Sequence, residues 1–153
     1  MMYRDVIMPD NKRWKCLEVG IDGDERPSGN YKVFGKGNDW KTLDNVAHLM
    51  PDIVADLCDT QIDDKFNLII VSQTLEHIYD FNKAISECYR MLEDGGYLII
   101  DCPFVYPFHG TSDYGDYWRI SPQGMRKQLR SAGFDVISCN IYGDILTSAL
   151  AKK

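Results

Sequence analysis

Two apolar runs joined by an amphipathic segment constrain the fold of this chain more than any other feature. Residues 68–71 and 98–100 are apolar enough to form strands that are buried on both faces. The residues between them place apolar and charged side chains at helical spacing, and a strand–helix–strand unit has a right-handed crossover. The two strands are therefore predicted to be parallel neighbours in an α/β sheet.

The segment between the two strands is predicted to be a helix that ends at a glycine pair. Its apolar side chains recur at helical spacing and are Phe81, Ile85, Cys88, Tyr89 and Leu92. Gly95 and Gly96 follow, and glycine adopts the left-handed conformation that commonly ends a helix. Residues 72–77 open at the carboxyl edge of the sheet, where folds of this kind bind ligands.

The remaining segments predict further strands and one more helix around this unit. Ser121 is a typical N-cap with Pro122 at the first helical position, so a helix is expected from there to about residue 132. Residues 20–39 are rich in Gly, Asp, Asn and Pro and are expected to be mostly loop. Strands are predicted at residues 14–19, 40–43 and 53–55, one helical turn at residues 46–50, and an antiparallel hairpin at residues 134–141 and 145–151. The predicted fold class is a three-layer, doubly wound, mostly parallel α/β sheet with a C-terminal antiparallel hairpin, in a single domain over residues 1–153.

Length, charge and cysteine usage argue against several classes of protein. The chain has 153 residues and a net charge of −6, and its basic residues are scattered, whereas nucleic-acid binding needs clustered Lys and Arg. Only Arg126, Lys127 and Arg130 cluster, and a solvated helix face explains them, so no nucleic-acid partner is expected. Residues 1–15 lack the apolar block of a signal peptide, and no apolar run has the length of a membrane span. The five cysteines form no Cys-x-x-Cys pair, which predicts reduced thiols in a cytoplasmic protein and no cluster of metal ligands.

Four fragments along the chain carry a family resemblance. They are Phe-Asn-Leu-Ile-Ile at residues 66–70, Leu-Glu-His at 75–77, Tyr-Arg-Met-Leu-Glu-Asp-Gly-Gly at 89–96 and Leu-Ile-Ile-Asp-Cys-Pro at 98–103. In this order and spacing they resemble the central part of class I S-adenosylmethionine (SAM)-dependent methyltransferases, most closely the group that acts on small molecules or glycans. The resemblance implies a seven-strand Rossmann-like sheet and SAM as the cofactor. Compared with that family, the N-terminal substrate-covering helices are expected to be missing and the first crossover helix is expected to be short or lost.

The resemblance assigns the acidic and glycine residues after the first strand to the cofactor. Glu18, Gly20, Asp22 and Gly23 occupy the position of the family's first motif, in which glycine lets the backbone approach SAM and an acid holds its ammonium group. Here acidic residues intervene between the glycines, which departs from the usual pattern. A plain turn after a strand is the alternative interpretation.

The next strand ends supply the remaining expected cofactor contacts. Asp44 would accept hydrogen bonds from both ribose hydroxyls, since a carboxylate offers two acceptor oxygens. Asp56 resembles the acid that meets the adenine amino group, with Leu57 packing on the ring. Ser72 and Gln73 would lie over the sulfonium position. For both aspartates the alternative is a capping or turn residue.

Residues 104–120 form a long aromatic loop that is expected to hold the methyl acceptor. His109 or Asp116 would deprotonate an attacking hydroxyl, while Tyr117 and its aromatic neighbours would stack on a sugar. His77 is either a further base or a brace for the loop. Arg119 either holds a phosphate or carboxylate or, with Trp118, locks the loop onto the sheet. Similar loops occur in methyltransferases near surface-polysaccharide and glycolipid genes, which suggests a role in polysaccharide biosynthesis.

The leading hypothesis is SAM-dependent methyl transfer to a small-molecule, sugar or glycolipid acceptor in the cytoplasm. The alternative is a non-catalytic, degenerate methyltransferase-fold protein that acts as a binding or assembly subunit. A nicotinamide-dependent enzyme ranks third, because no Gly-x-Gly-x-x-Gly opens a helix after the first strand. An open aromatic loop would also expose an apolar patch, so a homodimer or a partner chain is expected to cover it.

Overall fold

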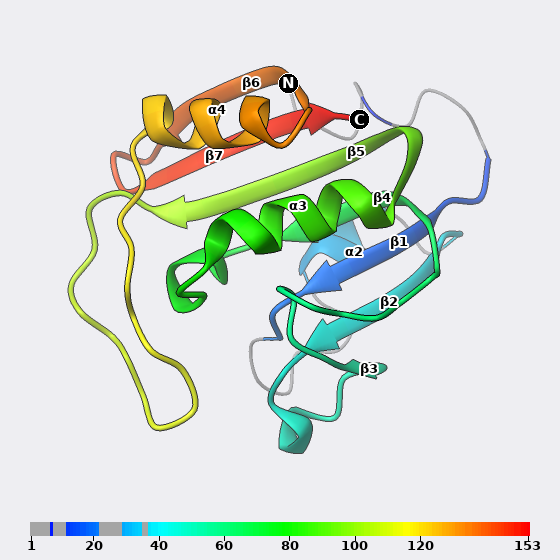
Figure 1. The fold of residues 1–153 in the computed structure, drawn as a ribbon, viewed down its shortest axis with the longest axis horizontal. Coiled ribbons are helices and arrows are strands. Elements are labelled where there is room, and N and C mark those ends of the chain that lie inside the picture. The colour runs from blue at the N-terminus through cyan, green and yellow to red at the C-terminus, as the bar shows by residue number, and fades with distance from the viewer. Residues whose placement is uncertain (1–6, 8–11, 22–28, 35–36) are drawn as a thin grey trace.

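The computed structural model describes residues 7, 12–21, 29–34 and 37–153, which include one seven-stranded sheet of order β3-β2-β1-β4-β5-β7-β6 (Figure 1). The first five strands in this order pair in parallel, while β7 pairs antiparallel with both β5 and β6. The strands are β1 (Lys15–Val19), β2 (Asp39–Asp44), β3 (Ile53–Val54), β4 (Phe66–Val71), β5 (Leu92–Pro103), β6 (Asp135–Tyr142) and β7 (Leu146–Lys152). The predicted fold class, including the antiparallel hairpin, is confirmed.

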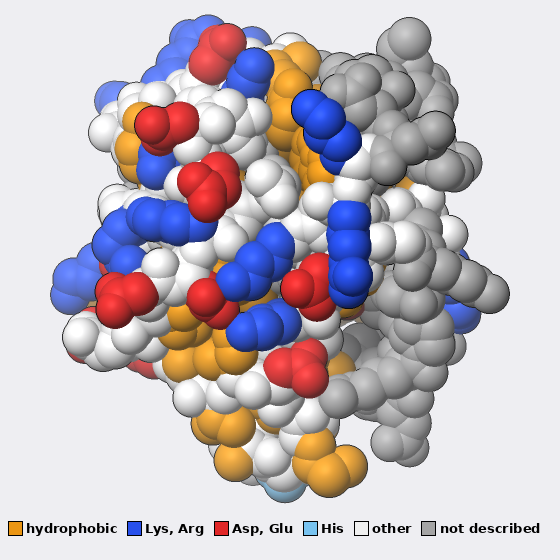
Figure 2. Space-filling model, turned by 90° about the vertical axis from the view of Figure 1, so that its right-hand side faces the viewer, with side chains coloured by type: hydrophobic (Ala, Val, Ile, Leu, Met, Phe, Trp, Pro, Cys, Tyr) orange, Lys and Arg blue, Asp and Glu red, His pale blue; other side chains and the backbone are white. Residues whose placement is uncertain are grey.

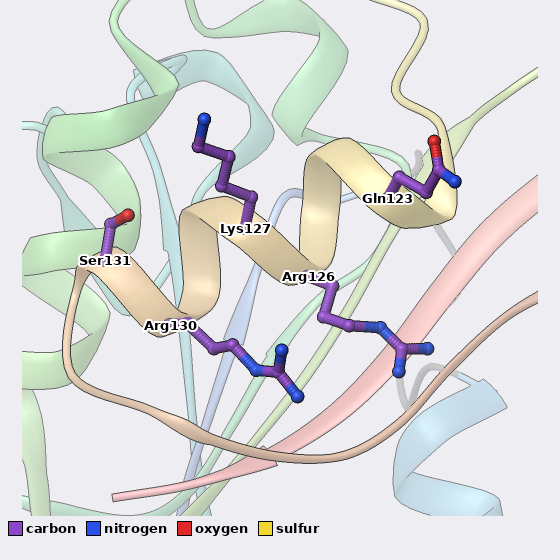
Figure 3. Close-up of a pocket in the computed structure, with 5 residues that line it drawn as sticks. All are labelled: Gln123, Arg126, Lys127, Arg130 and Ser131. Carbon is purple, nitrogen blue, oxygen red and sulfur yellow. The ribbon is translucent and has the colours of Figure 1, made fainter.

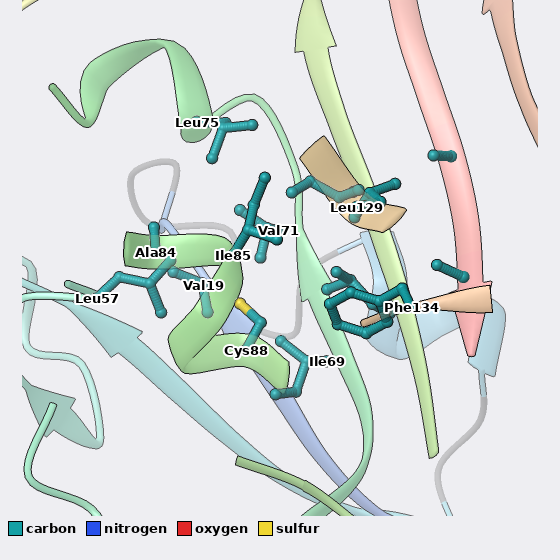
Figure 4. Packing of buried hydrophobic residues seen from close by; sticks show 14 of the residues in the cluster. Val19, Leu57, Ile69, Val71, Leu75, Ala84, Ile85, Cys88, Leu129 and Phe134 are labelled. Carbon is teal, nitrogen blue, oxygen red and sulfur yellow. The ribbon is translucent and has the colours of Figure 1, made fainter. Parts of the chain in front are cut away.

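Helices cover both faces of the sheet and give the fold three layers. Helices α3 (Phe81–Met91) and α4 (Pro122–Ser131) lie on one face, and the short α2 (Gly29–Phe34) lies on the other (Figure 1). The larger hydrophobic cluster packs between the sheet and α3 and α4, with Ile85 and Leu129 reaching in from the two helices (Figure 4). The smaller cluster covers the opposite face and includes Ile7 and Phe34. The strands β4 and β5 are therefore buried on both sides, as their continuous apolar runs predict.

Helix α4 and the hairpin form as the sequence predicts. The Ser121 side chain caps α4 by accepting a hydrogen bond from the backbone of Gly124, and Pro122 is the first helical residue. Met125 and Leu129 are buried against the sheet, and Gly133 adopts a φ of 104° just after the helix. Residues 20–39 are not all loop, however, because α2 occupies Gly29–Phe34. The first crossover therefore keeps a helix among its described residues.

The predicted helix stop at Gly95 and Gly96 is wrong. Helix α3 ends at Met91, and Leu92 immediately begins β5 opposite Phe66, whereas the next paired positions are Leu68 and Tyr97. The residues between these pairs form an irregularity in the strand, and Gly95 has a φ of 82° within it. A Cβ on Gly96 would lie 3.1 Å from the carbonyl oxygen of Asn67. The glycine pair thus marks a bulge at the start of a strand.

The amino edge of the parallel strands carries interspersed charges of both signs (Figure 2). There the carboxylate of Asp64 lies 2.9 Å from the ammonium groups of Lys15 and Lys41. Hydrogen bonds from these two lysines lower the pKa of Asp64 to about 2. Within the described part of the chain, no helix is long and apolar enough to cross a membrane.

Gly20 lies where the end of β1 meets the loop after β4. Its amide donates to the carbonyl of Leu43, and its φ of 82° is a conformation that glycine adopts without strain. A Cβ on Gly20 would overlap the Thr74 hydroxyl, at 1.9 Å. That hydroxyl in turn donates to the carbonyl oxygens of Val19 and Ser72. The end of β1 and the loop after β4 are therefore locked together by the lack of a side chain at position 20.

We expect Gly20→Ala to destabilise the protein by more than the roughly 1–3 kcal/mol that a left-handed non-glycine residue costs, because the clash with Thr74 adds to that strain. Adding Thr74→Ala should restore the part of the stability that is lost to the clash, but not the part that is lost to backbone strain at position 20. Urea unfolding of the two variants measures both parts. Gly37→Ala is the matched control, since a Cβ there meets no atom within 4 Å. Equal losses in Gly20→Ala and Gly37→Ala would contradict this account.

Candidate functional site

The candidate site lies at the carboxyl edge of the parallel strands. Because β1, β2, β4 and β5 run in the same direction, the residues that follow each strand meet at this edge. The 3₁₀ turn η2 (Leu75–His77) follows β4, and the aromatic loop at residues 104–120 follows β5. This loop extends from the sheet on the side opposite the amino edge (Figure 1). The expected cofactor and acceptor residues therefore share one edge of the molecule.

Asp44 ends β2 and is the most buried of the predicted cofactor acids that the structure describes. The residue as a whole is only 7% exposed to solvent. One carboxylate oxygen accepts from the amide of Ile21 at 3.0 Å, and the other accepts from the amide of Val46 at 2.8 Å. Each oxygen keeps a second lone pair. The carboxylate thus fixes the loop after β1 and retains capacity to accept from a ligand hydroxyl.

The other predicted cofactor residues are in more ordinary environments. Asp56 accepts from the amide of Cys58 at 2.8 Å, which is the turn contact that the alternative interpretation predicts. Leu57 is buried in the main hydrophobic cluster. Glu18 is half-buried within β1. Asp22 and Gly23 lie outside the described residues.

Ser72 and Gln73 are tied to an acid that the sequence analysis did not single out. The Ser72 hydroxyl donates to Asp101 at 3.0 Å, and the backbone amide of Gln73 donates to the same carboxylate at 2.9 Å. Burial raises the pKa of Asp101, and the two hydrogen bonds oppose that shift. Asp101 directly follows the apolar run at residues 98–100 within β5, and an acid at the end of such a run is the signal that could have identified it.

Glu76 is the second unpredicted acid, and it is fully buried. Neither of its carboxylate oxygens accepts a hydrogen bond within the described residues. Burial raises the pKa of its carboxyl group, while its own amide, His77 and His109 act in the opposite direction. Its carbonyl accepts from the amide of Tyr117 at 2.8 Å, which ties η2 to the aromatic loop. A buried carboxylate without partners is costly unless a ligand or ion satisfies it.

Two histidines face this carboxylate from different segments. The Nε2 atoms of His77 and His109 lie 3.8 and 3.7 Å from Glu76 Oε1. The His77 and His109 rings meet edge to face, with centroids 4.9 Å apart. The sequence predicted no cluster of metal ligands, but the fold gathers these three residues, whose potential ligand atoms lie within 4.8 Å of one another. No local pattern in the sequence showed this cluster, because His77 and His109 are distant in sequence and meet only in the fold.

Arg119 and Asp116 hold the aromatic loop in place. The guanidinium donates to both Asp116 oxygens, at 2.5 and 2.9 Å, and also to the carbonyls of Tyr106, Pro107 and Trp118. Arg119 holds the pKa of the Asp116 carboxyl well below its usual range. Asp116 also accepts from the amide of His109 at 2.9 Å. These contacts fit the interpretation that Arg119 locks the loop, and they make Asp116 a weak base.

Trp118 anchors the loop while other aromatic rings remain exposed. The Trp118 indole donates to the carbonyls of Ile78 and Tyr79, so it too fits the bracing interpretation. His77 donates from Nδ1 to the carbonyl of Gly115, which is the bracing contact expected for that residue. The exposed rings around this edge belong to Tyr79, Tyr106, Phe108 and Tyr117. They provide a stacking surface beside the two histidines.

A hollow also lies along helix α4, outside the candidate site. It is lined by Gln123, Arg126, Lys127, Arg130 and Ser131 (Figure 3). The Arg126 guanidinium donates to the carbonyl of Cys139 on β6, so part of this basic cluster supports the packing of α4 on the hairpin. This agrees with the expected solvated helix face.

A family model described as "Methyltransferase domain" matches residues 19–100, which is more than half of the chain. The chain therefore belongs to this methyltransferase family, which confirms the family resemblance predicted from the sequence. The matched region runs from the end of β1 into β5. It includes the expected cofactor residues from Gly20 to Gln73, together with Glu76 and His77.

Solved structures share the fold at low sequence identity. A SAM-dependent methyltransferase from Mesorhizobium loti is 11% identical, with a TM-score of 0.72 over 99% of this chain and 96% of that one. Phosphoethanolamine N-methyltransferase 2 of Haemonchus contortus, solved with SAM, is 13% identical, with a TM-score of 0.73 over 97% of this chain and 50% of that one. The [4+2]-cyclase SpnF is 13% identical, with a TM-score of 0.71 over 99% and 79%.

Curated sequences with similarity to this chain include lysine–tRNA ligases of Coxiella burnetii strains. They are 22% identical over 147 residues, a region that covers 86% of this chain and 30% of each ligase. The chain thus spans about 30% of the length of the curated relatives it matches.

We expect Arg119→Lys to destabilise the protein by roughly 1–3 kcal/mol, because lysine cannot reproduce the paired hydrogen bonds to Asp116. Hydrogen exchange should increase across residues 104–120 and stay unchanged in β4. Arg126→Lys is the matched control, since the Arg126 guanidinium donates a single hydrogen bond to the carbonyl of Cys139 among the described residues. The bracing role is wrong if exchange in the loop does not respond to Arg119→Lys.

Proposed function

We propose that this protein binds SAM at the carboxyl edge of β1, β2 and β3 and transfers its methyl group to an acceptor held by the aromatic loop. The proposal rests on Asp44, a buried carboxylate at the end of β2 in a chain that belongs to a methyltransferase family. The SAM found in the Haemonchus contortus relative supports the choice of cofactor. Gly20, Asp56, Leu57, Ser72 and Gln73 would line the same site.

A sugar or glycolipid is the acceptor that the loop favours. Tyr106, Phe108 and Tyr117 are each about half exposed or more, and such rings stack on the apolar faces of sugars. Methyl transfer by displacement at a sulfonium depends mainly on alignment, and a base is needed only for a poor nucleophile. Four residues were expected from the sequence to act on the acceptor. Of these, His77 and His109 would present ring nitrogens near the acceptor. Tyr117 would supply a stacking surface, and Asp116 would position the loop.

A non-catalytic role is the second candidate, and one observation favours it. The first crossover helix α2 spans six described residues, shorter than the helix that the family resemblance implies at this place. A ligase activity is not proposed, because the match covers 30% of the lysine–tRNA ligases. The exposed rings beside the site also support the expectation that a second copy or a partner chain covers this edge.

The thiols support a reducing, cytoplasmic environment. All five cysteines are free, and burial raises the pKa of Cys16, Cys88 and Cys102 to about 12. Protonated, buried thiols behave as small apolar side chains rather than as disulfide precursors. This matches a protein that works where thiols stay reduced.

We expect Asp44→Ala to weaken SAM binding by about 10- to 100-fold, because the ribose hydroxyls lose a charged acceptor. Calorimetric titration with SAM and with its demethylated product measures the change. Asp52→Ala is the matched control: Asp52 also accepts two hydrogen bonds at β2, both from Thr42, but it is far more exposed. Unchanged affinity in Asp44→Ala, or equal loss in both variants, would remove Asp44 from the cofactor site.

We expect Tyr117→Ala to lower methyl transfer at least tenfold while SAM affinity stays within about twofold, since the ring lies outside the cofactor positions. Transfer of labelled methyl groups from SAM to a panel of nucleotide sugars and glycolipids provides the measurement. Ile137→Ala on the edge strand β6 removes a comparably exposed apolar side chain and should change neither property. If SAM binds but no acceptor in the panel gains a methyl group, the sugar proposal fails; if SAM does not bind, the non-catalytic role is favoured.

A further inference from the structure

Three potential metal-binding atoms converge between η2 and the aromatic loop. Oε1 of Glu76 lies 3.8 Å from Nε2 of His77 and 3.7 Å from Nε2 of His109. Glu76 is fully buried, and neither of its oxygens accepts a hydrogen bond within the residues that the structure describes. The two histidines are partly exposed, with side chains 16% and 32% accessible. Solvent and small ligands therefore reach the cluster from the histidine side.

In both histidines, the contacts of Nδ1, which faces away from Glu76, indicate whether Nε2 faces Glu76 with a hydrogen or with a lone pair. Nδ1 of His77 lies 2.5 Å from the carbonyl oxygen of Gly115, which can only accept, so Nδ1 carries the hydrogen. Nδ1 of His109 lies 3.1 Å from the carbonyl oxygen of Pro107 and 3.2 Å from Oδ2 of Asp116, both of which can only accept. The Arg119 guanidinium, which can only donate, lies farther from this nitrogen, at 3.5 Å, so the two closer acceptors favour the hydrogen on Nδ1. An imidazole with its single hydrogen on Nδ1 points the unprotonated Nε2 toward the carboxylate.

This arrangement leaves three lone-pair donors facing one another. A proton shared between Glu76 and one histidine does not satisfy them, because 3.7 and 3.8 Å exceed hydrogen-bond length. A metal ion bonded at roughly 2.0–2.1 Å would hold its ligand atoms about 3.3–3.6 Å apart. The two carboxylate–imidazole distances are only a few tenths of an ångström longer, whereas all three potential ligand atoms lie within 4.8 Å of one another, so the two rings would also move toward each other to close the site. Metal-binding histidines characteristically donate their other nitrogen to a carboxylate or carbonyl, as both rings do here.

We propose that Glu76, His77 and His109 bind a divalent transition-metal ion of the Zn²⁺ class. Two imidazole nitrogens and one carboxylate oxygen form a ligand set that suits Zn²⁺ and Co²⁺ and disfavours Mg²⁺, which prefers oxygen ligands. Three protein ligands leave a coordination position for water or for a ligand hydroxyl. Asp116 acts as the outer partner of His109, and the Arg119 clamp keeps that carboxylate in place.

The metal ion gives the proposed methyl transfer a way to activate a hydroxyl acceptor, a role that rests on the proposed function. An acceptor hydroxyl bound to the ion would lose its proton to solvent more readily. Its oxygen would then form a bond to the methyl carbon of SAM as the carbon–sulfur bond breaks, and the electron pair of that bond would stay on sulfur. The binding site itself does not depend on this role.

Calorimetric titration of the chelator-treated full chain with Zn²⁺, Co²⁺ and Mg²⁺ tests the site. One equivalent of Zn²⁺ and of Co²⁺ should bind, with Mg²⁺ at least 100-fold weaker. His77→Ala, His109→Ala and Glu76→Gln should each weaken Zn²⁺ binding at least tenfold. Glu76→Gln should also raise the melting temperature of the metal-free protein, because the amide group can donate to the histidines. Circular dichroism verifies that each variant is folded, and His109→Ala, in the exposed loop, is the decisive one if Glu76→Gln does not fold.

The third histidine of the chain is the matched control. His48 is 66% exposed and lies 3.5 Å from Asp113, so His48→Ala should leave Zn²⁺ binding unchanged, as should Cys58→Ser at the partly exposed thiol. No saturable Zn²⁺ binding in the wild type, or loss in a control equal to that in His109→Ala, would overturn the proposal. SAM titration of the same samples separates the two proposals: SAM binding without Zn²⁺ binding rejects the metal site alone, and Zn²⁺ binding without SAM binding rejects only the proposed function.

Discussion

The parallel pairing of strands that are buried on both faces is the constraint on which the rest of this structure depends. Because β4 and β5 are covered on both sides, they can be joined only through a helix that crosses one face of the sheet. Every segment that follows such a strand must therefore start at the same edge. Asp44, Glu76, Asp101 and the aromatic loop owe their proximity to this rule and not to any attraction between them.

The aromatic loop needs a second constraint, because residues 104–120 contain no helix or strand. Arg119 supplies it by donating to the loop's own carbonyls and to Asp116, while Trp118 fastens the loop to the segment after η2. A guanidinium is suited to this task, since its planar set of donors can satisfy several acceptors at once. The same contacts hold His109 beside Glu76, so a change that disorders the loop would also disrupt the histidine cluster.

The sequence predicted the parts of the fold that depend on local patterns. The βαβ unit, helix α4 with its Ser121 cap and the antiparallel hairpin follow from periodicity and capping alone. Gly95 and Gly96 misled because a positive φ serves a strand bulge as readily as a helix end. The link between His109 and Glu76 could not be predicted, since it depends on how a long loop folds back over η2, and no local pattern encodes that distance.

The position of β7 has a consequence for how the chain reaches this fold. Although β7 is the most C-terminal of the described strands, it lies between β5 and β6 and pairs with both. During synthesis, β5 emerges long before residues 146–152 do, and until then its outer edge has no partner. An unpaired apolar edge of this kind invites pairing with other chains. The nascent protein is thus most prone to aggregation in the interval between these two strands, and the rate of translation across α4 and β6 sets how long that interval lasts.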